Sequence, residues 1–160
     1  MKKGPWLMSL LGIILIILGL ISFIESLVMN RPFEIFWFCY SGLLIIGIGM
    51  LLKNSTIVES QLLILIIPDI FWSIDFISHI ISGTSIFGFT NWVFLPGPIM
   101  PRIITLQHLF MVPIAIYTIA ILPIKKNKSW VISIVQMMLF FIIARIFTSP
   151  EKNINCVYTL

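Results

Sequence analysis

The sequence predicts an all-α integral membrane protein, a bundle of about five transmembrane helices. Two observations support this fold class. Of the 160 residues, 59% are hydrophobic and only 10% are charged, and the mean hydropathy is +1.12. A soluble domain is about 45–50% apolar and about 25% charged. A soluble enzyme, a disordered chain and a disulfide scaffold are therefore excluded, and we expect residues 1–160 to form a single transmembrane domain.

Five apolar segments are each long enough to cross a bilayer, which takes about 20 residues at a rise of 1.5 Å per residue. The first follows Lys2 and Lys3 and is too long for the core of a signal peptide, so we expect it to be a retained helix. Polar or proline-containing breaks separate the segments. The predicted spans are about 6–29, 33–52, 57–81, 103–124 and 130–148.

The connection between the third and fourth spans, residues 82–102, combines glycines and prolines with aromatic residues. Its aromatic side chains are Phe87, Phe89, Trp92 and Phe94. A segment with these breakers cannot form a helix exposed to lipid, yet it is too apolar for a free loop. We expect an interfacial loop that caps the bundle, with its rings at the depth of the lipid headgroups.

Three glycines in the second span, Gly42, Gly47 and Gly49, offer small surfaces for helix contact. Their spacing is not the GxxxG pattern of close helix pairs. Ordinary bundle packing is therefore the expectation for this helix.

The distribution of lysine and arginine predicts the orientation in the membrane. With five spans, the side of the membrane that holds the N-terminus carries six cations: Lys2, Lys3, Lys53, Lys125, Lys126 and Lys128. The other side carries four: Arg31, Arg102, Arg145 and Lys152. The expected location is the cytoplasmic (inner) membrane of a prokaryote, with the N-terminus in the cytoplasm and the C-terminus outside. We expect the apolar spans to contact the lipid bilayer. Because the cations are scattered and form no basic stripe, we expect no nucleic-acid partner. A membrane-protein partner or a homo-oligomer is compatible with this arrangement.

Polar groups inside the spans gather toward the outer end in this topology. An ionisable group at the centre of a span costs about 2.5–3.5 kcal/mol on insertion scales, so it needs a partner or a function. The predicted pocket residues are Asp75, His79, Gln107, His108, Arg145, Arg102, Asn153 and Asn155.

Asp75 and His79 are four residues apart and therefore share one face of a helix. In the structural interpretation, these side chains and Arg145 satisfy one another and hold the bundle together. Alternatively, Asp75, His79 and His108 bind a divalent metal ion such as zinc or manganese and support a metal-assisted hydrolase. No established catalytic motif accompanies them, and no other cofactor is expected.

A third interpretation is a path for protons or a solute through Asp69 and Asp75. Asp69 follows Pro68, which leaves a carbonyl without its helical donor and can kink the helix. This interpretation describes a transporter rather than an enzyme.

Several short elements follow residue 70. They are Trp72-x-x-Asp75-Phe76, the element Gly88-x-Thr90-Asn91-Trp92-x-Phe94 in the loop, Leu106-x-His108, and the tail Asn153-Ile154-Asn155-x-Val157. Through them, about half of the chain resembles a family of uncharacterised bacterial and archaeal multi-pass membrane proteins. The resemblance brings no known activity. It singles out Asp75, Arg102, His108, Asn153 and Asn155, and it implies a tail that folds back over the mouth of the bundle. The chain departs from the family pattern at Asn91 and Cys156.

Together these observations predict an outward-facing polar pocket, capped by the interfacial loop and the C-terminal tail. We expect the pocket to bind a small polar ligand, a lipid headgroup or a partner protein. The hydrolase and the transporter are the alternatives.

Overall fold

Backbone N–H and C=O groups must be paired inside lipid, and a helix pairs them within one segment. The computed structural model describes residues 4–123 and 128–158, and all regular elements among these residues are helices. The segments long and apolar enough to cross a membrane are Trp6–Val28, Ser55–Ser82, Ile99–Ile121 and Ser129–Phe147. The prediction of an all-α membrane protein is confirmed.

The first part of the chain contains α1 (Gly4–Val28), the 3₁₀ helix η1 (Pro32–Phe36) and α2 (Phe38–Leu51). The predicted span 33–52 is therefore too long. Its first residues form the separate turn of η1, which begins at Pro32, and the regular helix starts only at Phe38. At 1.5 Å per residue α2 is about 21 Å long, shorter than the hydrocarbon core of about 30 Å.

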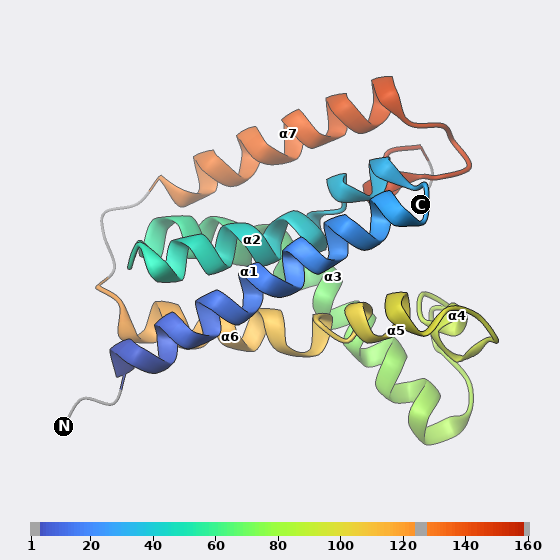
Figure 1. Ribbon diagram of the computed structural model, residues 1–160, viewed down its shortest axis with the longest axis horizontal. Helices are drawn as coiled ribbons and strands as arrows, with labels where there is room; N and C mark the ends of the chain where they lie inside the picture. Colours follow the sequence, from blue (N-terminus) through green and yellow to red (C-terminus); the bar gives the residue numbers. More distant parts are fainter. Residues whose placement is uncertain (1–3, 124–127, 159–160) are drawn as a thin grey trace.

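The longest helix is α3 (Ser55–Ser82). Asn54 caps its first turn, because its side-chain oxygen accepts the N–H groups of Thr56 and Ile57 at 3.1 and 3.4 Å. Pro68 lies inside the helix, and α3 changes direction between its two halves (Figure 1). The helix ends at Gly83, whose φ of 75° is the left-handed conformation that glycine adopts readily.

The fourth predicted span, 103–124, consists of two helices, α5 (Ile99–Thr105) and α6 (His108–Ile121). Between them the backbone makes 3₁₀-type bonds, such as that from the Gln107 N–H to the Ile104 carbonyl at 3.1 Å. The interfacial loop is shorter than predicted because α5 already begins at Ile99. The loop itself includes the short helix α4 (Asn91–Phe94).

The chain ends with α7 (Ser129–Phe147) and a short 3₁₀ turn, η2 (Ile154–Cys156). Figure 1 places the start of α1, the end of α2 and the start of α7 at one end of the bundle. The interfacial loop, η1 and the C-terminal tail lie at the other end, which we call the loop end. Of the lysines predicted on the side of the N-terminus, Lys2, Lys3, Lys125 and Lys126 lie outside the described residues.

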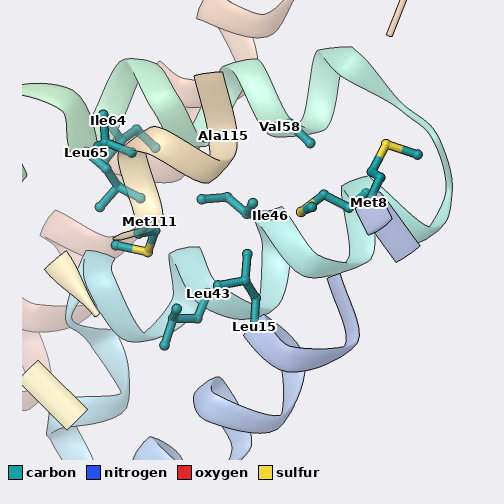
Figure 2. Close-up of a cluster of buried hydrophobic side chains, with 11 residues drawn as sticks. Met8, Leu15, Leu43, Ile46, Val58, Ile64, Leu65, Met111 and Ala115 are labelled. Atoms are coloured by element: carbon teal, nitrogen blue, oxygen red, sulfur yellow. The ribbon is translucent and has the colours of Figure 1, made fainter. Parts of the chain in front are cut away.

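The apolar core lies where α1, α2, α3 and α6 meet (Figure 2). Leu43 and Ile46 from α2 are fully buried there, and Met111 and Ala115 of α6 pack against them. By contrast, many leucines and isoleucines on the outer faces of the helices are exposed. This distribution fits helices that face lipid on one side and one another on the other.

α1 and α2 approach each other closely at Gly12 and Gly47. A Cβ atom at Gly47 would lie 2.6 Å from the carbonyl oxygen of Gly12. The expectation of ordinary packing is therefore wrong for this pair, because two glycines on different helices meet although neither sequence contains GxxxG.

Candidate functional site

The Asp75 carboxylate, which is fully buried near the end of α3, holds the interfacial loop. Its Oδ1 accepts hydrogen bonds from the backbone N–H groups of Phe87 and Gly88 at 2.6 and 3.2 Å. Its Oδ2 accepts bonds from the N–H and the hydroxyl of Thr90 at 2.8 and 2.9 Å. Both oxygens are therefore engaged with the loop, which supplies the donors that a buried carboxylate needs.

His79 also contacts the loop, but through different partners. Its Nδ1 lies 3.0 Å from the Ser85 hydroxyl, which in turn is 3.2 Å from the Thr90 hydroxyl. The imidazole stacks on the ring of Phe94, with the ring centres 3.8 Å apart. Asp75 and His79 thus share a helix face, as predicted, and each of them fastens part of the loop.

A continuous column of five stacked rings runs from His108 to His79. His108 stacks on Trp72 at 4.7 Å, and Trp72 stacks on Phe76 at 5.0 Å. Phe76 stacks on Phe94 at 5.4 Å, and His79 completes the column. Because the two histidines occupy opposite ends of this column, they are separated by three aromatic rings and do not converge on one ligand.

A second polar group lies deeper, where the middle of α3 meets the break between α5 and α6. Asp69 and Gln107 are 2% and 4% exposed, and Asp69 Oδ1 is 4.0 Å from Nε2 of His108. Among the described residues, Asp69 Oδ2 and both polar atoms of the Gln107 side chain have no hydrogen-bond partner. Cys39 of α2 lies close enough to interact with both Asp69 and Gln107. We call Asp69, Gln107 and His108 the buried triad.

Three charged residues meet at the loop end of α1 and η1. The Arg31 guanidinium is 2.6 Å from Glu25 and 3.2 Å from Glu34. Burial raises the pKa of the Glu34 carboxyl above its usual value, and the nearby Arg31 guanidinium opposes this effect. Glu25 is 8% exposed, so Arg31 supplies the charge partner that a buried carboxylate requires.

A pocket of about 290 Å³ opens beside Arg31. Arg102, at the last turn of α5, also lines this pocket and donates a hydrogen bond to the carbonyl of Leu95. We call this cavity the arginine pocket. Its lining residues are Met29, Arg31, Trp92, Leu95, Pro96, Gly97, Pro98, Pro101 and Arg102. Arg102 is therefore the one predicted pocket residue that lines it.

The asparagines of the C-terminal tail bind backbone groups. The Asn155 amide donates to the carbonyl of Phe36 at 2.7 Å and accepts the N–H of Phe38 at 3.1 Å. Asn153 accepts the N–H of Tyr158 at 2.9 Å. The tail therefore packs at the junction of η1 and α2, where it satisfies an N–H in the first turn of α2 that has no partner within the helix.

Arg145 lies with this tail. Its guanidinium carbon is 4.4 Å from the centre of the Tyr158 ring, and the Tyr158 hydroxyl donates to the carbonyl of Arg145 at 3.0 Å. The structure therefore associates Arg145 with the tail, while the described partners of Asp75 all belong to the loop.

The metal-binding interpretation required Asp75, His79 and His108 to come together. Within residues 4–123 and 128–158, no group of three or more His, Cys, Asp or Glu side chains is arranged so that it could hold a metal ion. Asp75 and His79 bind the loop, whereas His108 faces Asp69.

Sequence reasoning did not anticipate the role of Arg31, which it counted only as a topological charge. The available signal was its position six residues after Glu25 and three before Glu34. It also missed the pairing of Gln61 with Gln136. These two side chains exchange hydrogen bonds of 2.7 and 3.1 Å between α3 and α7.

Comparison with known proteins adds no relative to this description. No family model, no curated protein and no solved structure matches the chain. The resemblance carried by the short elements after residue 70 stays a prediction.

Proposed function

We propose that this multi-pass membrane protein binds the phosphate of an acidic lipid headgroup in the arginine pocket. The observation that carries the proposal is that Arg31 and Arg102, from different segments of the chain, line one pocket at the loop end of the bundle. Basic pockets between membrane helices are typical binding sites for anionic headgroups.

The chemistry of the two arginines supports a phosphate ligand. A guanidinium carries five N–H donors in a planar fork that matches phosphate oxygens. The hydrogen bond to Leu95 uses one donor of Arg102 and fixes the direction of the side chain. In Arg31, two nitrogens pair with Glu25 and Glu34 and Nε is buried, so Arg102 is the guanidinium that supplies most of the donors for a phosphate.

The surroundings of the pocket favour a lipid over a soluble anion. Trp92 lines the pocket and is 45% exposed, and the neighbouring Leu95 is also exposed. Tryptophan is enriched at the depth of the headgroups, where its ring contacts the acyl chains and its N–H faces water. An acidic phospholipid presents a phosphate and an apolar chain together, which matches this lining.

Binding of an acidic lipid to the purified protein tests the proposal. The binding of added phosphatidylglycerol is measured by native mass spectrometry or by titration in nanodiscs of phosphatidylcholine. It is compared between the wild-type protein, the Arg102→Gln variant and the Arg145→Gln control. Arg145 is the matched control because it lies at the same end of the bundle but does not line the pocket. We expect Arg102→Gln to weaken phosphatidylglycerol binding about fivefold, since one arginine near the surface contributes about 1 kcal/mol.

Equal losses in Arg102→Gln and Arg145→Gln, or no loss in either, contradict the proposal. Inorganic phosphate is the second arm of the experiment. If phosphate competes with the lipid at similar concentrations, the ligand is a soluble anion and the lipid assignment is wrong.

The orientation belongs to the same proposal, with the N-terminus in the cytoplasm and the loop end outside the inner membrane. The lysine distribution along the sequence supports it. A reporter fused after Leu160 that is active only in the cytoplasm contradicts this orientation.

A further inference from the structure

The buried triad contains polar atoms that the described part of the fold leaves unpaired. Asp69 and Gln107 are nearly inaccessible, and Asp69 Oδ2, Gln107 Oε1 and Gln107 Nε2 have no hydrogen-bond partner among the described residues. An unpaired polar group costs several kcal/mol in a membrane interior. Such atoms on Asp69 and on Gln107, both of which interact with the Cys39 thiol, indicate a functional site.

The hydrogen bond of His108 to the backbone determines which ring nitrogen binds the exchangeable proton. Its Nδ1 is 2.7 Å from the carbonyl oxygen of Thr105. A carbonyl only accepts, so Nδ1 carries a hydrogen atom in either charge state of the ring. Consequently, Nε2 is the nitrogen that gains or loses a proton, and it faces Asp69 Oδ1 at 4.0 Å.

Charge balance determines how many protons this pair holds. A carboxylic acid beside a neutral imidazole has no net charge, and a carboxylate beside an imidazolium has none either. Removing that one proton, or adding a second, leaves a net charge in a low-dielectric interior, which is costly. The 4.0 Å separation is longer than a direct hydrogen bond, and a proton crossing it would need one bridging water molecule or a small rotation of either side chain.

Within residues 4–123 and 128–158, His108 is the ion-pair partner of Asp69, and the helices that pack closely on α3 are α2, α6 and α7. α6 supplies His108, and α2 supplies the neutral thiol of Cys39. α7 also packs on α3, but its one charged residue is Arg145, which lies on Tyr158.

We propose that the buried triad is an intramembrane proton-binding site, in which Asp69 and His108 share one transferable proton and Gln107 binds the water molecule between them. In the transfer, the O–H bond of Asp69 breaks and an N–H bond forms at Nε2 of His108. The products are a carboxylate and an imidazolium, so atoms and charge balance without another reactant. This site is independent of the arginine pocket.

The test follows both groups in the protein reconstituted into lipid bilayers. Infrared difference spectroscopy records the C=O band of a protonated carboxyl, and ¹⁵N solid-state NMR records the two nitrogens of His108, each over a pH series. We expect the carboxyl band and the Nε2 signal of the wild-type protein to change together, at the same pH values, because the titration steps of a coupled pair belong to the pair and not to either residue. The Nδ1 signal is expected to stay that of a protonated nitrogen throughout.

Variants assign the signals. Asp69→Asn is expected to abolish the carboxyl band and to remove the pH response of Nε2 over the same range. Glu59→Gln, which changes another acidic residue of α3, is the control and is expected to leave both signals unchanged. The wild-type titration alone still decides the question if Asp69→Asn does not fold.

Three results would overturn the proposal. The first is a pair of unrelated midpoints for the carboxyl band and the Nε2 signal. The second is a carboxyl band that persists unchanged in Asp69→Asn. The third is loss of the band on addition of Na⁺ at constant pH, which identifies the triad as a cation site instead.

Discussion

Asp75 and Thr90 lie fifteen residues apart and are joined by two hydrogen bonds of 2.8 and 2.9 Å, one to the backbone N–H of Thr90 and one to its hydroxyl. Both residues are fully buried. Because Asp75 and Thr90 are buried away from water, the backbone donor of Thr90 needs a partner from the protein. The Asp75 carboxylate is this partner, and it thereby fixes the loop that carries Trp92 and Leu95 of the arginine pocket.

Asp75→Asn is expected to destabilise the protein by about 1.5–3 kcal/mol, the range for hydrogen bonds to a charged group. The substitution replaces one accepting oxygen with an NH₂ group that faces other donors. Thr90→Val keeps the backbone bond, removes the hydroxyl bonds to Asp75 and Ser85, and is expected to cost about 1 kcal/mol. Thermal unfolding in detergent, combined with hydrogen exchange at the amides of Phe87 and Gly88, measures both effects. Unchanged exchange at these amides in Asp75→Asn contradicts the role assigned to the carboxylate.

Gly47→Ala is expected to cost about 1–3 kcal/mol, the usual range for overpacking. The added Cβ would lie 2.6 Å from the Gly12 carbonyl oxygen, so the backbones of α1 and α2 must separate. Gly42→Ala is the matched comparison. There the Cβ meets a terminal methyl of Leu65 at the same distance, and a side chain can move aside. Thermal unfolding of both variants is the measurement, and a larger loss in Gly42→Ala contradicts the explanation.

The Gln61–Gln136 pair is expected to connect α7 to α3 with a coupling energy of about 0.6–1.7 kcal/mol, as measured for hydrogen bonds between membrane helices. The two amides satisfy each other across the interface. A double-mutant cycle of Gln61→Leu and Gln136→Leu measures the coupling. Strictly additive losses show that the bonds contribute nothing to the association of the two helices.

Glu34 gives the protein a defined response to pH. Because burial raises its pKa above the usual value of 4.5, the folded protein keeps the proton to a higher pH than the unfolded chain does. The contribution of Glu34 to stability is complete below its pKa in the unfolded chain. It is lost as the pH rises through its pKa in the folded protein. We expect Glu34→Gln to reduce this loss, as measured by melting temperatures over a pH series that starts below 4.5.

Glu151 is the control for the pH experiment because its pKa is lowered, whereas that of Glu34 is raised. A hydrogen bond from the Ser149 side chain lowers the pKa of its exposed carboxyl. Its contribution to stability is therefore lost as the pH falls. Parallel curves for the wild-type protein and Glu34→Gln would show that burial of Glu34 does not affect stability.

Hydropathy was sufficient to predict the class of fold but not the bounds of every helix. The predicted span 33–52 begins with four of the five residues of η1, and its regular helix covers only Phe38–Leu51. Hydropathy is the same for a 3₁₀ turn and an α-helix of equal composition, so it cannot distinguish them. The signal for the difference is Pro32, which starts a helical turn because it has no N–H to pair.

The predicted polar pocket separates into distinct groups in the structure. Asp75 and His79 fasten the loop, His108 faces Asp69, and Arg145 lies on Tyr158. Depth along a helix can be estimated from the sequence because the rise per residue is constant. The neighbours at a given depth depend on how each helix is rotated and on the kink at Pro68, and neither follows from hydropathy.

The sequence by itself determined that this protein lies in a membrane, because the scarcity of charged residues leaves too little polar surface for water. It also predicted that polar side chains concentrate toward one end of the bundle. Only the tertiary structure decided which of them meet. Partners such as Arg31 with Glu25, or Gln61 with Gln136, come together through helix rotation and through breaks in the helices. These depend on side-chain packing between segments far apart in the chain, and hydropathy carries no information about that packing.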